Sequence, residues 1–429
     1  MASTTAAPGT AAAAAKAHTT NRKWAIGLLI AVIVIFVLYS QILPSSPPEV
    51  QTFFRRWLSI AAVNEATLWV VFALGLNIVV GYAGLLDLGY VAFWAIGGYV
   101  AGWIMSPFAS QMSAGWSGLK VSILGHPPNI PGLDTGIHVN FWLVLPIAGL
   151  FCALWGVIIG APTLRLKSDY LALVTLGFGE IIPQIFRNGE RIGPGGSFNL
   201  SNGDKGISPV DPIPTWPFSY IPGVPKELAL AANDLPYKFL VYALLAAFTL
   251  FVSIRIREGR LGRAWLAIRE DELAASMMGV PLMKTKLAAY AVGAFAGGLG
   301  GVAFATHVNG VFASRFDFAI SITLLAMVVM GGMGNVWGVT VGALVLAWIN
   351  STGLEQVGQQ INSSFGTSID FPSYQFLLFG LILILMMLFR REGFLPETRT
   401  RQVLQEPERG ELEAVGADLE GDHLEGDRV

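Results

Sequence analysis

The segment LGRAWLAIREDELAASMMGV, Leu261–Val280, is charged and lies between two long apolar runs. Its Ala, Leu, Arg, Glu and Met residues favour an α-helix. Gly279 is a typical residue at a helix C-terminus, and Pro281 prevents the helix from continuing. The apolar runs on either side determine whether this helix joins two soluble elements or two membrane spans, so the segment decides how the whole chain is organised.

The amino-acid composition is that of a protein that crosses a membrane several times. Hydrophobic residues make up 53% of the 429 residues and charged residues only 13%, and the chain contains 12 Trp and 26 Phe. Soluble domains contain about 25% charged residues. The composition therefore predicts a polytopic membrane protein in contact with membrane lipid. The net charge of −2 says nothing about nucleic acid, but the lack of a dense basic patch argues against a nucleic-acid partner.

Apolar runs of about 20 residues are long enough to cross a bilayer as helices. Such runs, some of them short or broken, lie at 24–43, 60–80, 85–105, 141–161, 169–186, 237–254, 287–308, 320–330, 336–349 and 374–389. We therefore expect an all-α fold, a polytopic helix bundle with about ten transmembrane spans and a cytoplasmic helix at Leu261–Val280. The first run can also be read as a signal peptide, but its length and the lack of an A-x-A cleavage site favour a retained span.

Basic residues predict which side of the membrane each connection occupies. With the N-terminus in the cytoplasm, the cytoplasmic segments hold Arg22, Lys23, Arg165, Lys167, Arg255, Arg257, Arg260, Arg263, Arg269, Lys284, Lys286, Arg390 and Arg391. Arg55 and Arg56 fall on the other side and are an exception. This orientation places Leu261–Val280 in the cytoplasm.

Three regions follow from this pattern. Residues 1–23 are rich in Ala and Thr and are predicted to be a disordered cytoplasmic N-terminus. Residues 24–391 form the transmembrane domain, and residues 392–429 form an acidic, disordered cytoplasmic tail. The long connection at 187–236, rich in Gly and Pro, either covers an entrance or is a plain solvent loop.

The charged segment itself has two possible roles. At helical spacing, one apolar surface is formed by Leu261, Ala264, Trp265, Ile268, Leu273, Ala274, Met277 and Met278. A charged band, Arg269–Glu272, lies between its two halves. Such a helix can dock into a groove of a cytosolic partner. It can also be an interfacial helix that only joins two spans.

Four motifs in the right order resemble one family of membrane proteins. The charged segment with its continuation KTKLAAYAVGAFAGGLGGVAFA, GYAGLLDLGYVAFWAIGGYVAG from Gly81, GAPTLRLKSDYLALVTLGFGEI from Gly160, and MGGMGNVWGVTVGALVLAWI from Met330 are similar to the LivM-type permeases. These are membrane subunits of ATP-binding-cassette importers for branched-chain amino acids. The resemblance covers most of 81–389 and implies that 24–391 is a permease domain in the plasma (cytoplasmic) membrane.

The resemblance also implies partners and a site. The partners are a second, LivH-like permease, two cytosolic ATP-binding-cassette ATPases, an extracytoplasmic solute-binding protein and a small-molecule substrate. The chain has no GxxxxGK[ST] phosphate-binding loop, which fits a subunit that is not an enzyme and has no cofactor. The coupling helix that inserts into the ATPase surface comprises Arg263, Trp265, Ile268, Arg269, Glu270, Asp271, Glu272, Met277 and Gly279.

Polar residues inside the predicted spans are candidates for the substrate pathway, because polar groups in lipid are unfavourable and usually face a cavity or another helix. These residues are Asn64, Glu65, Asn77, Asp87, Tyr90, Thr175 and Glu180. Glu65 and Asp87 are the first choices, and an interhelical hydrogen bond is the alternative for each residue. Many members of the family carry Ser and His where this chain has Asp87 and Tyr90.

Glycine patterns predict close contacts between helices. Glycines recur at four-residue spacing at Gly98 and Gly102, at Gly293, Gly297 and Gly301, and at Gly334, Gly338 and Gly342. This spacing favours helix packing over a moving gate. GGMGN, Gly331–Asn335, interrupts an apolar run and predicts either a re-entrant break or a tight turn.

These observations favour a permease subunit of an ATP-driven importer for branched-chain or related amino acids. The alternatives are a permease for urea or short-chain amides, and a stand-alone secondary transporter or channel. A membrane enzyme is disfavoured, because no GxSxG motif occurs and no HExxH or other metal-ligand spacing is formed by His18, His126, His138, His307 and His423. The single cysteine, Cys152, excludes an internal disulfide and a cysteine metal cluster.

Overall fold

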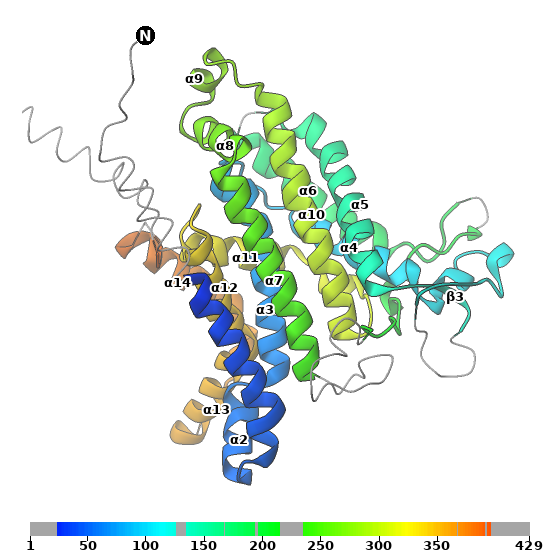
Figure 1. Ribbon diagram of the computed structural model, residues 1–429, viewed down its shortest axis with the longest axis vertical. Coiled ribbons are helices and arrows are strands. Elements are labelled where there is room, and N and C mark those ends of the chain that lie inside the picture. The colour runs from blue at the N-terminus through cyan, green and yellow to red at the C-terminus, as the bar shows by residue number, and fades with distance from the viewer. Residues whose placement is uncertain are drawn as a thin grey trace, which may run out of the picture.

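The apolar runs form long helices that pack side by side in a bundle (Figure 1). The computed structural model describes residues 24–125, 134–166, 168–193, 196–214, 235–366, 368–390 and 393–395. The helices are Trp24–Ser45, α2 Pro48–Trp57, α3 Ile60–Asn77, α4 Val91–Ile104, α5 Phe141–Thr163, α6 Ser168–Arg187, α7 Leu235–Glu258, α8 Arg260–Glu270, α9 Glu272–Met277, α10 Leu282–Val308, α11 Phe318–Gly331, α12 Val336–Trp348, α13 Leu354–Phe365 and α14 Gln375–Phe389. A π-helical turn, η3 (Ile78–Tyr82), extends α3.

All the expected runs form helices, which confirms an all-α polytopic bundle. In the described chain, seven helices are long and apolar enough to cross a membrane: Trp24–Ser45, Pro48–Tyr82, Phe141–Thr163, Leu235–Glu258, Leu282–Val308, Ala313–Gly331 and Val336–Phe365. Shorter apolar helices lie at Val91–Ile104 and Phe371–Met386. The number of spans therefore stays a prediction. The expected start of the third run at Leu85 is wrong, because the chain at 83–90 is not helical.

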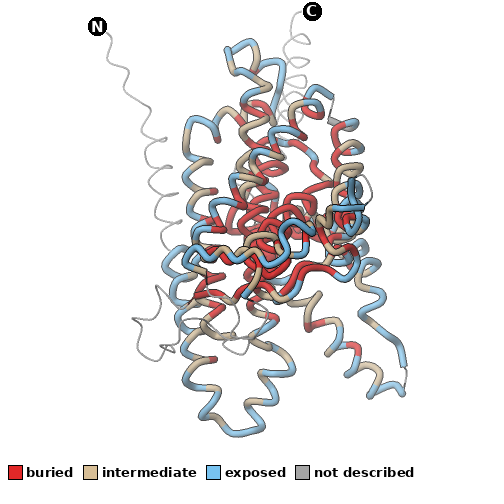
Figure 2. The backbone as a smooth tube through the Cα atoms, turned by 90° about the vertical axis from the view of Figure 1, so that its right-hand side faces the viewer, coloured by how far each residue is buried: buried red, intermediate tan, exposed pale blue. Residues whose placement is uncertain are grey.

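Helix α10 lies at the centre of the bundle and packs against α3, α4 and α5. Buried residues gather in the middle of the molecule (Figure 2). The α10 glycines permit this approach, since a Cβ at Gly301 would lie 2.5 Å from the Trp94 carbonyl oxygen. A Cβ at Gly297 would lie 2.9 Å from the Phe93 Cβ. The helix backbones therefore meet with no side chain between them, which supports the packing interpretation of the glycine pattern.

We expect Gly301→Ala to destabilise the bundle and Gly380→Ala on α14 to have little effect. A methyl group at Gly301 would overlap the α4 backbone, whereas nothing lies within 4 Å of a Cβ at Gly380. Overpacking of this kind destabilises a protein by about 1–3 kcal/mol. The measurement is the thermal unfolding midpoint of each detergent-purified variant. Equal midpoints for the two variants would contradict close packing of α10 on α4.

The connection between α4 and α5 contains a small sheet that the sequence did not predict. Its strands are β1 Met105–Ser106, β2 Lys120–Ile123 and β3 Gly136–Val139. The central strand, β3, is antiparallel to β1 and parallel to β2. Figure 1 shows the sheet beside the bundle, away from α8 and α9. Strands of two to four residues are too short to produce an alternating apolar pattern.

A buried ion pair fastens this sheet to the chain at 196–214. His138 Nδ1 lies 2.9 Å from both carboxylate oxygens of Asp211, and both side chains are buried. Burial lowers the pKa of His138, but the hydrogen bond and charge of Asp211 raise it by more, so this pKa lies above its ordinary value of 6.5. The Asp211 backbone N–H also donates to the Met105 carbonyl oxygen at 2.7 Å. The 196–214 segment is thus held to both β1 and β3.

The described part of the long connection after α6 packs against the bundle and is not a free solvent loop. Ile207 and Val311 exchange two backbone hydrogen bonds of 2.9 Å. The side chains of Ile207, Val210 and Ile213 are buried. Because Val311 follows directly after α10, this segment covers the end of α10 that lies opposite α8 and α9 (Figure 1).

Ordered chain continues past the last helix and beyond the predicted boundary at 391. The Phe394 N–H donates to the Met330 carbonyl oxygen at 2.8 Å, and Asn335 Nδ2 donates to the Leu395 carbonyl oxygen at 2.8 Å. Gly393–Leu395 therefore satisfy carbonyl groups at the end of α11, and the domain boundary at 391 stays a prediction. Residues 1–23 and 396–429, where disorder is also expected, lie outside the described residues.

Candidate coupling site and polar pathway residues

Helices α8 and α9 project from one end of the bundle (Figure 1). The sequence predicts one continuous helix from Arg263 to Gly279, and this prediction is wrong at Asp271. That residue is extended, and its Oδ1 accepts from the Leu273 and Ala274 N–H groups at 2.8 and 3.0 Å. A carboxylate at this position caps the N-terminus of a new helix in competition with continuing the old one. The element is therefore two short helices that meet at a corner.

Trp265 and Ile268, predicted to contact the ATPase, are buried inside this chain instead. Trp265 is 0% exposed and Ile268 is 6% exposed. The Trp265 Nε1–H donates to the Thr285 carbonyl oxygen at 2.7 Å. Because the side chains of Trp265 and Ile268 pack inside this chain, they hold α8 against the beginning of α10.

The exposed apolar surface of this element lies at α9. Leu273, Met277 and Met278, here named the α9 tip, are 68%, 78% and 85% exposed. Large apolar side chains exposed together on a surface outside the bundle are a mark of a protein contact. The other predicted coupling residues divide by exposure: Arg269 is half-buried, and the exposed ones are Arg263, Glu270, Asp271, Glu272 and Gly279.

Polar contacts fasten α8 and α9 to the bundle. Glu272 Oε1 lies 2.6 Å from Lys286 Nζ, and the side chains are 52% and 8% exposed. This ion pair joins α9 to α10. A second contact joins α8 to η3, since Arg269 Nη1 donates to the Gly81 carbonyl oxygen. Together with the Trp265 contact, these bonds connect the element to two helices of the core.

Asn77 extends this chain of contacts to the GGMGN turn. Its Oδ1 accepts from the Gly334 N–H at 2.9 Å, and a Cβ on Gly81 would lie 2.7 Å from the same nitrogen. The Asn335 N–H donates to the Gly332 carbonyl oxygen at 3.1 Å, which closes a tight turn between α11 and α12. The structure therefore agrees with the tight-turn interpretation of this motif. Asn77 therefore makes an interhelical contact, which was the alternative to a role in the substrate pathway.

Three other predicted pathway residues meet in the middle of the bundle. Thr175 Oγ1 on α6 accepts from the Leu88 N–H at 3.1 Å, and the Tyr90 hydroxyl donates to the Gly293 carbonyl oxygen at 2.9 Å. Asp87 is 2% exposed; its Oδ1 accepts from the Gly89 N–H, and its Oδ2 has no hydrogen-bond partner among the described residues. The chain at 83–90 is thus a non-helical segment, and its residues Asp87, Gly89 and Tyr90 are buried between helices.

The remaining predicted pathway residues lie elsewhere. Asn64 is buried near the beginning of α7, where its Nδ2 donates to the Leu235 carbonyl oxygen at 3.0 Å. Glu65 is half-buried and accepts from Trp69 Nε1 at 3.3 Å. Glu180 is exposed on α6. The structure therefore does not bring the seven residues into one site, because spacing within a helix says nothing about which helices are neighbours.

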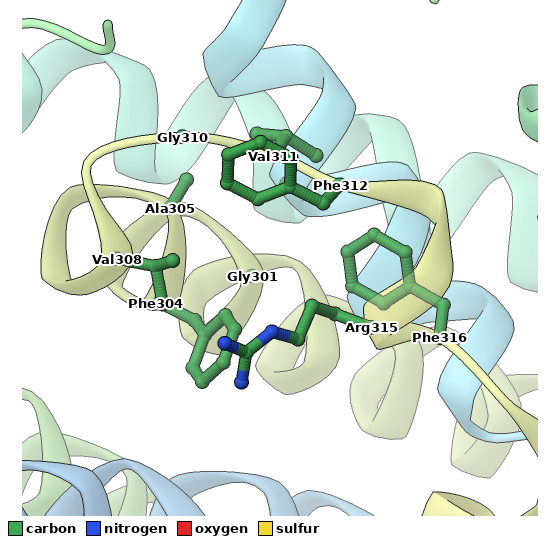
Figure 3. A pocket seen from close by; sticks show the side chains of 10 residues that line it. Gly301, Phe304, Ala305, Val308, Gly310, Val311, Phe312, Arg315 and Phe316 are labelled. Carbon is green, nitrogen blue, oxygen red and sulfur yellow. The ribbon is translucent and has the colours of Figure 1, made fainter. Parts of the chain in front are cut away.

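A shallow indentation lies at the end of α10 opposite α8 and α9. Its lining is apolar apart from Arg315, whose side chain extends beside Phe304 in Figure 3. Phe312 and Phe316 lie on the other side of the same pocket. Sequence analysis did not find this pocket, since its residues come from α4, α10 and the chain that follows α10.

The charge distribution orients the bundle. The end that carries α8 and α9 holds Arg165, Arg255, Arg257, Arg260, Arg263, Arg269, Lys284, Lys286 and Arg390. Arg55 and Arg56 lie at the other end on α2, where Arg56 Nε donates to Gln356 Oε1 at 2.7 Å. An excess of Lys and Arg marks the cytoplasmic side of membrane proteins. The positions of these helix ends are consistent with α8 and α9 in the cytoplasm.

Known proteins that match this chain include permeases of branched-chain amino acid transport systems. A family model described as "Branched-chain amino acid transport system / permease component" matches residues 58–387. The chain is 34% identical over 366 residues to the high-affinity branched-chain amino acid transport system permease protein LivM of Escherichia coli, covering 81% of this chain and 73% of the relative. The probable LivM permease of Methanocaldococcus jannaschii is 25% identical over 362 residues, covering 79% and 95%.

A second bacterial relative supports the same grouping. The high-affinity LivM permease protein of Salmonella typhimurium is 33% identical over 362 residues, covering 81% of this chain and 72% of the relative. No solved structure matches the chain significantly. The family match spans the region from the beginning of α3 to the end of α14, which includes α8 and α9. The chain therefore belongs to the family of permease components of branched-chain amino acid transport systems.

Proposed function

We propose that this chain is the permease subunit of an ATP-binding-cassette importer that moves branched-chain amino acids across the cytoplasmic membrane. It performs no chemistry of its own and is not an enzyme. A LivH-like second permease completes the membrane part, two cytosolic ATPases supply energy, and an extracytoplasmic binding protein delivers the substrate. The three relatives named above are permeases of branched-chain amino acid transport systems, which supports this substrate class.

The observation that carries the proposal is the α9 tip. Three large apolar side chains stand at the basic end of the bundle, outside the lipid-spanning helices and uncovered by this chain. An apolar projection of this kind fits a groove on a cytosolic protein. The coupling residues of this chain are thus Leu273, Met277 and Met278 at the contact, with the charged residues Arg263 and Glu270–Glu272 around it.

The contacts behind the α9 tip provide a route for mechanical coupling. ATP binding and hydrolysis move the ATPases, and the α9 tip moves with them. The Glu272–Lys286 ion pair and the hydrogen bond from Trp265 to the Thr285 carbonyl oxygen transmit this movement to α10. Because α10 packs against α3, α4 and α5, its displacement shifts the centre of the bundle. Packed helices of this kind switch between discrete arrangements and so can alternate access to the two sides.

The test is transport by the reconstituted importer. Proteoliposomes that contain this chain, the second permease and the ATPases are expected to accumulate radiolabelled leucine when ATP is inside and the loaded binding protein is outside. Uptake is expected to persist when ion gradients are collapsed. Leucine movement by the purified chain alone, driven by an ion gradient without ATPase, would instead favour a secondary transporter. ATP-driven uptake of urea or acetamide without leucine uptake would assign the amide alternative.

A further inference from the structure

Helix α6 differs from α5 in what it exposes. On α5 the exposed side chains are all apolar, among them Leu143, Ile147, Leu150, Leu154 and Ile158. On α6 the exposed side chains include Glu180 and Gln184, one turn apart. An ionisable group in a membrane span faces a water-filled cavity or another protein, because its transfer into lipid is unfavourable. The α5 face therefore suits lipid, and the α6 face does not.

The two exposed polar residues Glu180 and Gln184 lie on one face of α6. Leu173, Gly177, Glu180 and Gln184 recur at spacings of three or four residues and so share one side of the helix. The opposite side carries Leu171, Thr175 and Gly179, which are buried. There, a Cβ on Gly179 would lie 2.9 Å from the Gly89 Cα. The face with Glu180 thus points away from the rest of this chain.

Glu180 lies well inside α6, whose apolar run at 169–186 is predicted to cross the membrane. At a rise of 1.5 Å per residue it is about 18 Å from the beginning of α6 at Ser168 and about 10 Å from its end at Arg187. The cation at that end does not neutralise it, since Arg187 pairs with Asp204 at 3.5 Å and with Asp317 at 3.4 Å. Among the described residues no cation forms an ion pair with Glu180. The carboxylate is therefore an available acceptor in the membrane.

We propose that this α6 face lines the substrate pathway and that the Glu180 carboxylate binds the α-ammonium group of the amino acid in transit. Gln184, one turn toward the outer end, provides an amide N–H for the substrate carboxylate. Gly177, one turn toward the cytoplasm, has open space where a Cβ would stand, which leaves room for an apolar side chain. Leu173 and Ile181 flank this space with apolar groups. The face thus offers an acceptor, a donor and an apolar gap in one row.

The inference rests on the proposed function and adds the substrate subsite. In this arrangement a second permease forms the opposite wall of a water-filled pathway, and the α6 face stays in contact with that water. An α6 face packed tightly against a helix of that partner, without water, is the competing arrangement.

Cysteine accessibility tests whether the face is wet. The single native cysteine, Cys152, is buried and provides an unreactive background. In the assembled importer, Glu180→Cys and Gln184→Cys are expected to react with a positively charged, membrane-impermeant methanethiosulfonate reagent. Leu150→Cys and Leu154→Cys on the lipid-facing side of α5 are expected to stay unlabelled. Equal lack of labelling in the α6 variants and in the α5 variants would overturn the inference, since the α6 face would then be sealed or in lipid.

Transport by conservative variants tests the ammonium contact. Loss of a charge-assisted hydrogen bond in Glu180→Gln is expected to lower leucine uptake by roughly tenfold to a hundredfold. ATPase co-purification is expected to be unchanged, and Glu180→Asp to recover part of the uptake. Glu49→Gln, an exposed carboxylate in the first turn of α2, is the matched control and should transport normally.

The outcomes separate this inference from the proposed function. If the wild-type importer fails to transport leucine with ATP, the proposed function fails. If the wild type transports leucine and Glu180→Gln transports it equally well, the pathway role of Glu180 fails while the function stands.

Discussion

Replacing Leu273 and Met277 together by aspartate is expected to release the ATPase subunits from the purified importer. Both side chains are exposed on α9, 68% and 78%, and are the largest part of the apolar α9 tip. Burial of a side chain of this size against a partner stabilises a complex by about 1.5–3 kcal/mol. Two such losses correspond to a weakening of roughly a hundredfold or more. New carboxylates in an apolar groove would add an uncompensated desolvation penalty.

The measurement is co-purification of the ATPases with the tagged permease, together with ATP-driven leucine uptake. Ile123→Asp, an exposed apolar residue on β2 far from α9, is the control, and its ATPase content should equal that of the wild type. Membrane insertion of the double variant should be normal, because the side chains of the α9 tip are 68–85% exposed at the end of the bundle. Retention of the ATPases at wild-type yield would show that the contact lies elsewhere.

Removing the ion pair between α9 and α10 is expected to separate ATPase binding from transport. Lys286→Met keeps most of the side-chain volume but breaks the 2.6 Å contact with Glu272. The α9 tip stays exposed, so the ATPases should still bind, but movement of α9 would reach α10 only through α8 and the short connection at 278–281. A charge-assisted hydrogen bond contributes about 1.5–3 kcal/mol, and the lower end applies here because Glu272 is half-exposed.

The expected readout is leucine transported per ATP hydrolysed, which should fall severalfold while ATPase co-purification is unchanged. Lys284→Met is the matched control, since Lys284 lies on the same helix but is exposed. A charge swap, Glu272→Lys with Lys286→Glu, should recover part of the coupling if the pair acts as a link. If Lys284→Met and Lys286→Met behave alike, α9 does not drive α10 through this bond.

Much of the fold was accessible from the sequence because helices in a membrane depend on local properties. Length and apolarity predict where α3, α5, α7 and α10 lie, since each must satisfy its own backbone hydrogen bonds in lipid. The glycines of α10 predicted close packing from another local property, since the lack of a side chain allows a neighbouring helix to come close. The charged segment was placed correctly between α7 and α10, and Pro281 lies where α10 begins.

The site was only partly accessible. The corner at Asp271 could have been found, because aspartate followed by a helix-forming stretch is a typical N-cap. The burial of Trp265 could not, because its partner is the Thr285 carbonyl oxygen, twenty residues away, and helical periodicity does not say which face turns inward. For the same reason Glu180 and Asp87 looked alike in the sequence, yet one is exposed on α6 and the other is 2% exposed.

By itself, the sequence determined three things. It showed a multi-helix membrane protein, it showed the family that the protein resembles, and it showed the segment that lies outside the membrane. These properties follow from composition, hydrogen bonding within a helix, and local motifs. Only the tertiary structure decided that α9, and not Trp265, presents the exposed surface. It also decided that Gly393–Leu395 close the end of α11, and that α6 turns a carboxylate outward. Each of these depends on contacts between residues far apart in the chain, and such contacts are made by packing, which no local pattern encodes.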